Sequence, residues 1–350
     1  MSLSVCKIIR EWFFIPWSLP LFFWNCSAPD TLPMHTLSGY AQGTTFQITY
    51  DSSAGMLQGE VEKIFNAMDR ACSLYDSNSV IVRFNNAREG VEVDTLFASV
   101  FLLSKKIFEE TRGAFNPAVF PLVKLWGFDP AGGPPTMLRS IPGGDSLAQL
   151  IRFEDIRLDT LEGKIYCLKA RPGLQLDFNG IAQGYTVDLI CGLLDARGAH
   201  NYLVEVGGEI RARGLNTKKK PWRVGIEKPT DNNLERNLYA VVNLSDMALA
   251  TSGNYRKFYI KDGLRYSHTI NPFTGRPVEH NLLSISVFSG SCARADALAT
   301  AFMVMGNTQT LDWLKKYNDA EVFMISSGYQ EAYITYASEG IKPRLEAVRD

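Results

Sequence analysis

Asp296 and Thr300 are the residues whose types and spacing point most directly to chemistry. They stand in GSCARADALATAFMVMG, residues 290–306, where the apolar residues from Leu298 onward are typical of a buried helix. A helix that begins on Asp296 would place both side chains on one face, because residues i and i+4 are neighbours on a helix surface. An aspartate near a helix start often caps free N–H groups, whereas a carboxylate beside a hydroxyl also suits Mg²⁺. From this stretch alone, both interpretations stay open.

Four glycine-rich turns offer a second kind of chemistry. They stand between expected strands and helices, with the sequences FNGIAQG, EVGGEIRARG, TSGNYRKF and NPFTGRPV. Glycine lets a backbone approach a ligand closely, and consecutive N–H groups can bind an anion. Any one of these segments is equally compatible with an ordinary tight turn. None has the spacing of a Walker A loop or a Rossmann fingerprint, so neither of the common nucleotide motifs is present.

Length and charge limit the function classes. The chain has 350 residues, 46% of them apolar, which is enough for one large domain or two intimate ones. Lys and Arg total 36 against 37 for Asp and Glu, so no basic stripe favours a nucleic-acid partner. The short basic run TKKKPWR, residues 217–223, predicts a solvated loop.

The N-terminal segment is typical of an export signal. Two basic residues precede an aromatic and apolar run that holds two prolines and ends just before Cys26. The run is shorter than the roughly 20 residues that a membrane-spanning helix needs. We predict that residues 1–25 are a signal peptide, that Cys26 becomes the lipidated first residue, and that residues 26–37 are a linker. An ordinary cleaved signal or an uncleaved anchor is the alternative, because FFWN before Cys26 lacks the usual small side chains.

The remaining cysteines do not indicate a metal or redox motif. Cys72, Cys167, Cys191 and Cys292 are scattered and show no CxxC spacing, so zinc and thioredoxin-like functions are disfavoured. An exported protein can form disulfides, and the sequence leaves the pairing open.

Local patterns predict interleaved helices and short strands. Apolar periodicity predicts helices at 58–72 and 95–112, and a strand with a Gly-Thr break at 38–50. Asp, Ser and Asn residues predict a turn within 74–86. Two prolines in the aromatic segment 113–128 predict a loop without regular structure, and the Gly/Pro-rich segment 129–145 predicts an exposed insertion.

The second half of the chain continues this mixture. Residues 174–198 predict a strand, a glycine turn and a helix with a glycine C-cap. The other expected strands and hairpins are 201–214, 221–229, 239–253 and 266–278. The fold class is therefore α+β, with mixed sheets, packed helices and one catalytic body at 38–345, and a division into two lobes is left open.

Together these segments resemble the ApbE family of FAD:protein FMN transferases. The resemblance runs from about Gly39 to Gly306, and eight motifs follow the order of the family. They are GTTFQI, YDSNSVIVRFN, GAFNPAVFPLVKLWGF, LDFNGIAQGYTVD, VEVGGEIRARG, ATSGNY, YSHTINPFTGRPV and ADALATAFMVMG. The resemblance implies a T-fold-like α+β body. It also implies an enzyme that moves FMN from FAD to a Ser or Thr hydroxyl of an acceptor protein and releases AMP.

The resemblance also assigns catalytic and metal-binding roles. It implies a Mg²⁺ site made by Asp296, Thr300 and the backbone carbonyl of Gly180. A Mg²⁺ ion on the diphosphate would offset charge as the P–O bond breaks, and Asp296 would supply its anionic ligand. His268 matches a family motif and is a candidate for acid/base work or positioning, since an imidazole can take a proton near neutral pH.

Six residues are implied in FAD binding, with Tyr75 stacked on a ring of the ligand. They are Gln42, Tyr75, Asn116, Asp177, Gln183 and Leu283. Three of these positions depart from the pattern of the family. Gln183 stands where many relatives carry Lys, Gln42 where Met is common, and Asn116 where Asp is usual. The first change removes a positive charge near the diphosphate.

The implied partners are FAD and acceptor flavoprotein subunits of membrane redox complexes. Together with the N-terminal segment, the resemblance predicts an exported lipoprotein of the inner membrane that faces the periplasm. One alternative is an FAD diphosphatase, in which water replaces the acceptor hydroxyl. Another is a flavin-binding carrier lipoprotein without turnover.

Overall fold

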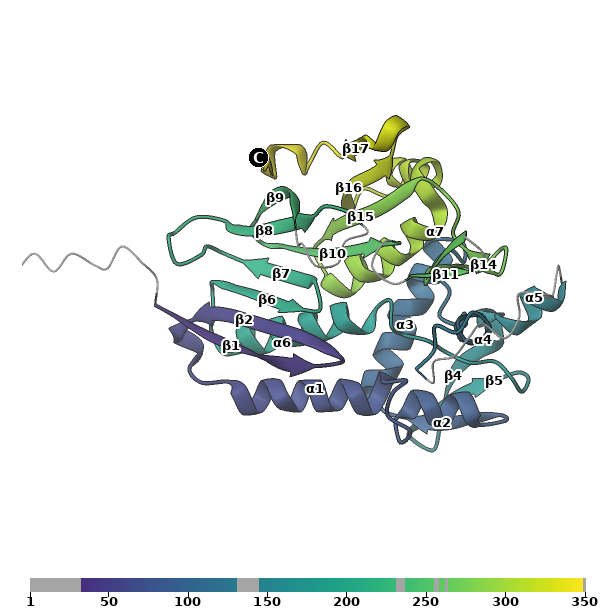
Figure 1. The fold of residues 1–350 in the computed structure, drawn as a ribbon. Helices are drawn as coiled ribbons and strands as arrows, with labels where there is room; N and C mark the ends of the chain where they lie inside the picture. The colour runs from purple at the N-terminus through teal and green to yellow at the C-terminus, as the bar shows by residue number, and fades with distance from the viewer. Residues whose placement is uncertain (1–32, 131–144, 231–236, 255–257, 262–263, 349–350) are drawn as a thin grey trace, which may run out of the picture.

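The computed structural model describes residues 33–130, 145–230, 237–254, 258–261 and 264–348 (Figure 1). The expected signal peptide, Cys26 and almost all of the expected insertion lie outside these residues. In the part of the chain that is described, no helix has the length and apolar character to cross a membrane.

Eight antiparallel strands form the central sheet, in the order β1-β2-β6-β7-β10-β15-β16-β17 (Figure 1). This spatial order follows the order of the strands along the chain. The strands are β1 Met34–Ala41, β2 Thr44–Asp51, β6 Tyr202–Val206, β7 Glu209–Arg213, β10 Met247–Gly253, β15 Leu282–Ser289, β16 Ala320–Ser327 and β17 Tyr333–Ala337.

Helices cover one face of the central sheet. The long helices are α1 Gln58–Cys72, α3 Thr95–Glu110, α6 Ala182–Ala196 and α7 Cys292–Lys316. Helix α6 packs on β6 through Val187 and Ile190, which share a buried cluster with Val204 and Val206. Helix α7 lies against β10 and β15. The two helices also contact each other, which brings the FNGIAQG and DALAT motifs together.

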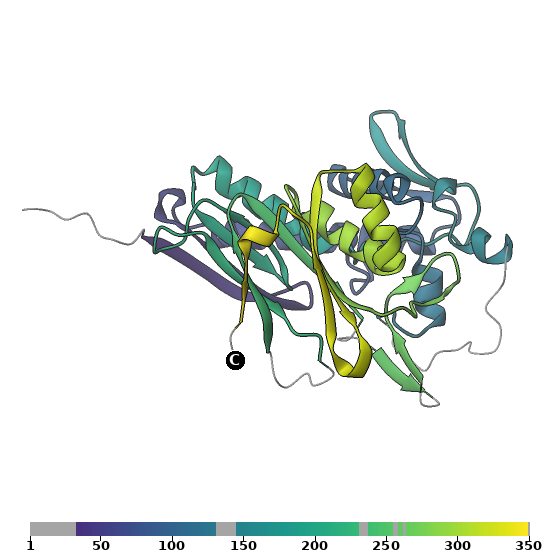
Figure 2. The ribbon, with the colours of Figure 1, turned by 90° about the horizontal axis from the view of Figure 1, so that it is seen from above.

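A three-stranded sheet covers the opposite face (Figures 1 and 2). Its order is β18-β9-β8, with β8 Trp222–Glu227, β9 Leu238–Leu244 and β18 Leu345–Ala347. Val242 is fully buried there among apolar residues of both sheets. Within β15, Val287 belongs to the core on the helix side and Phe288 to the core under the small sheet. Both faces of β15 are therefore buried, and its three serines are buried with its apolar residues.

The remaining elements extend the helix side. Helix α2 Val80–Asn86 and the sheet of β3 Gly90–Val93, β5 Lys164–Lys169 and β4 Ile156–Leu161 share a core with α3 and α7. A smaller apolar cluster joins α4 Phe120–Leu125, α5 Asp145–Leu150 and the ribbons of β11 Phe258–Lys261 with β12 Leu264–Ser267 and β13 Ile270–Asn271 with β14 Arg276–Pro277. The predicted α+β class is confirmed. The division into two lobes stays a prediction.

Most predicted elements are present, and the helix at 58–72 has the predicted bounds. The strand expected at 38–50 is instead the hairpin of β1 and β2. Its Gln42-Gly43 turn has φ of 52° and 73°, the pair of positive values that a type I′ hairpin turn requires. The aromatic segment 113–128 contains α4, because Pro121 stands at the start of the helix, where no backbone N–H is needed.

Two further expectations were wrong. The turn expected within 74–86 ends in helix α2, which begins at Val80 with Ser79 as its N-cap. The strand expected at 174–178 alternates buried and outward residues but joins no sheet. The four cysteines whose pairing was open are buried free thiols.

Candidate functional site

The site is built where the start of α6 meets the second turn of α7. Gly184 lies at the contact, and a Cβ built on it would stand 2.5 Å from the carbonyl oxygen of Cys292. Only a residue without a side chain allows this approach. The Gly184 N–H donates to Oδ2 of Asp296 at 3.1 Å. The carboxylate of Asp296 is therefore held between the two helices.

Asp296 does not cap α7, so that interpretation was wrong. The helix begins at Cys292, one turn earlier than predicted, and Ser291 is its N-cap, with Oγ accepting from the Arg294 N–H. Asp188 of α6 accepts the Cys292 and Ala293 N–H groups, each at 3.0 Å. These two side chains satisfy the helix start, which leaves Asp296 available for another role.

The environment of Asp296 opposes its ionised form. The residue is only 7% exposed, and desolvation raises the pKa of its carboxyl to about 7, with the Gly184 hydrogen bond acting in the opposite direction. Nearby Arg211 pairs with Asp188 at 2.6 Å, and no salt bridge among the described residues includes Asp296. A carboxylate desolvated in this way is one that a bound cation would stabilise.

Gly180 and Thr300 meet beside it. A Cβ built on Gly180 would lie 2.8 Å from Oγ1 of Thr300, so the backbone of the turn lies against this hydroxyl. Thr300 follows Asp296 by one helical turn. A carboxylate and a hydroxyl one helical turn apart, with the Gly180 backbone against the hydroxyl, offer hard oxygen donors of the kind that Mg²⁺ takes. Among the described residues, no group of three or more His, Cys, Asp or Glu offers another metal site.

Asp177 and Asn116 stand on two adjacent segments. The Asp177 N–H donates to the carbonyl of Pro117 at 2.7 Å, and its Oδ1 accepts the Asn179 N–H at 2.7 Å. Desolvation is the larger influence and raises the pKa of Asp177 to about 6. The Asn116 amide holds its loop in place, since Oδ1 accepts the Ala118 N–H at 2.9 Å and Nδ2 donates to the Ile151 carbonyl at 3.1 Å. The two segments therefore lie side by side.

Gln183 belongs to the first turn of α6, and the side chain of Gln42 reaches the same end of the helix from the β1–β2 turn. Nε2 of Gln42 donates to Oγ1 of Thr186 at 2.9 Å, and this hydroxyl donates to the Ala182 carbonyl at 2.8 Å. The amide of Gln183 rests against the β6–β7 turn, because a Cβ built on Gly207 would lie 2.8 Å from its Nε2. Both glutamine side chains thus lie at the start of α6.

His268 stands between β12 and β13, with its ring edge-on to Phe128 at a centroid distance of 6.5 Å. The turn that follows is fastened by Trp126, whose Nε1 donates to the Gly275 carbonyl at 2.7 Å. In the aromatic segment 113–128, Phe115, Phe120 and Trp126 are core residues, whereas Phe128 is partly exposed and lies beside His268.

Tyr75 and Leu283 have no such connection to the helix crossing. Tyr75 is 73% exposed, and no hydrogen bond or ring contact of the described residues joins its side chain to the cluster. Leu283 stands at a β-bulge of β15, and its carbonyl accepts the Asn254 N–H at 3.1 Å. The roles that the resemblance implies for these two residues stay predictions.

The sequence analysis did not identify three residues of the helix crossing, which are Gly184, Thr186 and Asp188. All three lie within the motif LDFNGIAQGYTVD. Gly184 and Asp188 are four residues apart on one helix face, which is the same spacing as Asp296 and Thr300. A glycine inside a predicted helix was the available signal, because it marks a close approach of another backbone.

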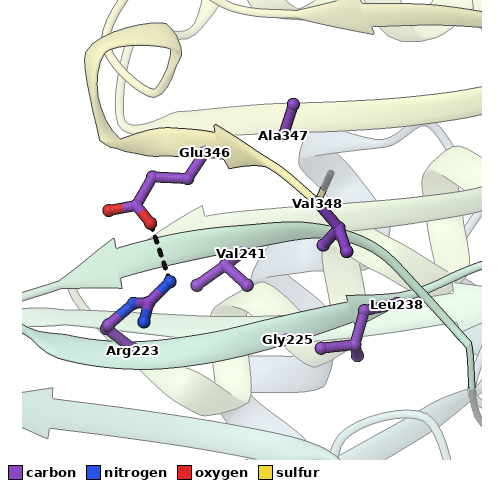
Figure 3. Close-up of a pocket in the computed structure, with 7 residues that line it drawn as sticks. All are labelled: Arg223, Gly225, Leu238, Val241, Glu346, Ala347 and Val348. Carbon is purple, nitrogen blue, oxygen red and sulfur yellow. Dashed lines mark hydrogen bonds and ion pairs between the residues drawn. The ribbon is translucent and has the colours of Figure 1, made fainter. Parts of the chain in front are cut away.

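A separate hollow lies on the small sheet (Figure 3). Leu238, Val241 and Val348 line it, with the Arg223–Glu346 ion pair at 2.8 Å on one side. None of the predicted site residues belongs to β8, β9 or β18. The hollow therefore has no connection with the chemistry of the helix crossing.

The fold and this site define a class: α+β proteins in which a glycine turn and two crossing helices present an oxygen donor set. Residues 42–324 match the model of the ApbE family. The chain belongs to the ApbE family, as its motifs predicted.

Relatives extend over nearly the whole chain. A Vibrio cholerae protein named FAD:protein FMN transferase is 36% identical over 347 residues, covering 96% of this chain and 99% of that protein. An Escherichia coli protein of the same name is 33% identical and covers 93% of this chain and 95% of that protein.

Solved structures agree in fold. The flavin transferase ApbE from Vibrio cholerae has a TM-score of 0.75 at 35% identity, over 89% of this chain and 99% of that chain. The Pseudomonas stutzeri flavinyl transferase ApbE in its apo form has a TM-score of 0.75 at 32% identity, over 88% of this chain and 96% of that chain.

Proposed function

We propose that this chain is an FAD:protein FMN transferase that uses Mg²⁺, attaches FMN to a Ser or Thr hydroxyl of an acceptor protein and releases AMP. The observation that carries the proposal is the buried Asp296 carboxylate at the helix crossing, with Thr300 one helical turn later and the Gly180 backbone against the Thr300 hydroxyl. Relatives of nearly full length that bear the enzyme name support the same class.

The reaction is a transfer at phosphorus. The acceptor oxygen forms a bond to the FMN phosphorus, the P–O bond of the diphosphate breaks, and AMP leaves with the bridging oxygen. When bound, Mg²⁺ neutralises charge on the diphosphate. Asp296 and Thr300 would hold the ion, and His268 would take the proton of the acceptor hydroxyl. The Asp177–Gly180 turn would orient FAD against the start of α6.

Gln183 bears on the balance between transfer and hydrolysis. Its neutral amide lies against Gly207, so it adds no positive charge beside the diphosphate. Binding then depends more on the metal and on backbone donors. Water in place of the acceptor hydroxyl would give FMN and AMP, which is the diphosphatase alternative.

Mass spectrometry separates the candidates. The purified protein is incubated with FAD, Mg²⁺ and a candidate acceptor from a membrane redox complex, with a Ser/Thr→Ala acceptor as the control. A gain of one FMN on the acceptor alone supports transfer. Free FMN and AMP with an unchanged acceptor would indicate a diphosphatase, and bound but intact FAD would indicate a carrier.

We also propose export and lipid anchoring at Cys26, which the basic start and the apolar run support. More than one acyl chain is needed for stable anchoring. Cys26→Ser should abolish palmitate labelling and release the protein from the membrane fraction, whereas Cys6→Ser should change neither. Unchanged labelling of Cys26→Ser would contradict this part of the proposal.

A further inference from the structure

Residues 174–178 form an extended segment whose backbone is held by side chains instead of a neighbouring strand. Leu174, Leu176 and Phe178 are buried, in the alternation of a strand. Asn85 acts as a partner for this segment: its Oδ1 accepts the Leu176 N–H at 2.7 Å, and its Nδ2 donates to the Leu176 carbonyl at 2.9 Å. Both backbone groups of Leu176 are thus paired by one buried amide.

Lys169 makes the second attachment. The residue is 6% exposed, and its Nζ donates to the carbonyls of Phe84 and Leu174, each at 2.8 Å. The ammonium also lies 4.3 Å from the centroid of the Phe84 ring. No ion pair of the described residues includes Lys169, and its burial lowers the pKa of the ammonium to about 8. A buried cation without a carboxylate is costly unless its hydrogen bonds are needed.

Both attachments join the C-terminal end of α2 to the segment that enters the site. Asp177 follows Leu176 directly and is held from the other side by the Pro117 carbonyl. Gly180, which lies against Thr300, follows three residues later. A slip of one residue in an extended segment would reverse every side chain, so it would exchange the positions of Asp177 and Phe178. The pairing at Leu176 prevents this slip.

We propose that Asn85 and Lys169 form a side-chain clamp that positions the Asp177–Gly180 turn, and through it the FAD and Mg²⁺ sites. The clamp touches neither ligand, so both are positioning residues. The inference rests on the proposed function for the identity of the two ligands. The Asn85 amide and the Lys169 ammonium bind the backbone of residues 174–178 as a neighbouring strand would, and so fix which of these residues face the core.

Asn85→Leu and Lys169→Met remove the hydrogen bonds and keep most of the side-chain volume. FAD affinity is measured by flavin fluorescence, and Mg²⁺ dependence by the free Mg²⁺ concentration that gives half-maximal turnover of FAD. We expect both constants to weaken by about 10-fold, as is usual when the partners that orient ligating groups are lost. Lys169→Arg keeps donors at this position and should restore most of the affinity.

A matched control separates positioning from stability. Val242→Ala removes apolar contacts under the small sheet and should lower the melting temperature without changing either constant. If the clamp variants behave like Val242→Ala, with a lowered melting temperature and both constants within about two-fold of the wild type, the inference is wrong. If Asn85→Leu does not fold, Asn85→Asp keeps the acceptor for the Leu176 N–H and tests the same step.

Hydrogen exchange gives a readout without ligand or turnover. The Leu176 and Asp177 amides should exchange faster in Asn85→Leu, while amides of β15 keep their protection. Unchanged exchange at both residues would overturn the clamp. If the wild type binds FAD but transfers no FMN, the proposed function fails. Loss of FAD affinity in the clamp variants would still support the inference.

Discussion

The two faces of the eight-stranded sheet bury very different chemistry. Under β8, β9 and β18 the core is apolar, and the charges of Arg223 and Glu346 lie at the surface. On the helix side, Asp296, Asp177 and Lys169 are desolvated, and each has a pKa displaced toward its neutral form. One face contributes stability, whereas the other holds groups that oppose it. Such a conflict is typical of a functional site.

Asp296→Asn should give the largest effect. We expect a loss of transfer of about 1,000-fold or more, because a bound metal supplies several kcal/mol of charge stabilisation. Without Mg²⁺ at pH 8, the variant should be more stable than the wild type by on the order of 1–3 kcal/mol. The folded-state pKa of Asp296 is raised from 3.8 to about 7, so the wild type loses stability as the pH rises from about 4 to about 7, and the loss is complete at pH 8.

Denaturant unfolding at pH 5 and pH 8 measures this stability difference. The advantage of the asparagine should shrink toward pH 5, where Asp296 of the folded wild type is protonated. Thr300→Ala should lower the transfer rate less than Asp296→Asn does, because water can replace a neutral ligand. Retained activity of Asp296→Asn at limiting Mg²⁺ would remove the residue from the site.

His268→Ala tests the acid/base assignment. Transfer should slow by about 100-fold, as expected for loss of a general base, while FAD affinity stays within about three-fold. Flavin fluorescence and the mass shift of the acceptor, measured on one preparation, provide the two values. Loss of affinity and rate in equal proportion would make His268 a binding residue.

Val242→Ala tests the opposite face. Removing buried methyl groups there should lower the free energy of unfolding by about 1–3 kcal/mol, with the transfer rate at 25 °C within about two-fold of the wild type. Thermal unfolding and a rate assay measure the two effects. A large loss of rate would show that the small sheet is coupled to the helix crossing and would break the comparison between the faces.

Lys169→Met should give the smallest effect, which is a change in how the free energy of unfolding depends on pH. The pKa of Lys169 is lowered to about 8, so between that value and about 10.4 the unfolded chain binds more protons at this group. The unfolding free energy of the wild type relative to the variant should therefore rise by about 1–2 kcal/mol from pH 7.5 to pH 9.5. A flat difference would show that Lys169 titrates normally.

The sequence predicted the fold class and most elements because their signals are local. Apolar periodicity gave α1 with its correct bounds, and glycine pairs marked the β6–β7 turn. The segment 174–178 was mistaken for a sheet strand because alternation reports burial on one side and not the partner of the backbone. That partner is Asn85, about 90 residues away in the chain, which no local pattern reveals.

The part of the site that could be predicted is also the part whose signal is local. Asp296 and Thr300 are four residues apart, so helix geometry alone suggested their common face. Gly180 comes from the turn before α6 and the N–H of Gly184 from its first turn, and only the packing of α6 on α7 brings them there. The motif resemblance named Gly180, whereas the Gly184 contact required the structure.

The order of the strands in the central sheet also has a consequence for synthesis. Because the spatial order follows the chain order, each strand can pair with one that has already emerged, and none must be inserted between two formed neighbours. The growing edge advances from β1 toward β17. Helix α7 lies between β15 and β16 in the chain, so the helix crossing closes late. A nascent chain that ends before Cys292 would expose the apolar surface that α7 covers, which makes that stage the one most open to aggregation and chaperone binding.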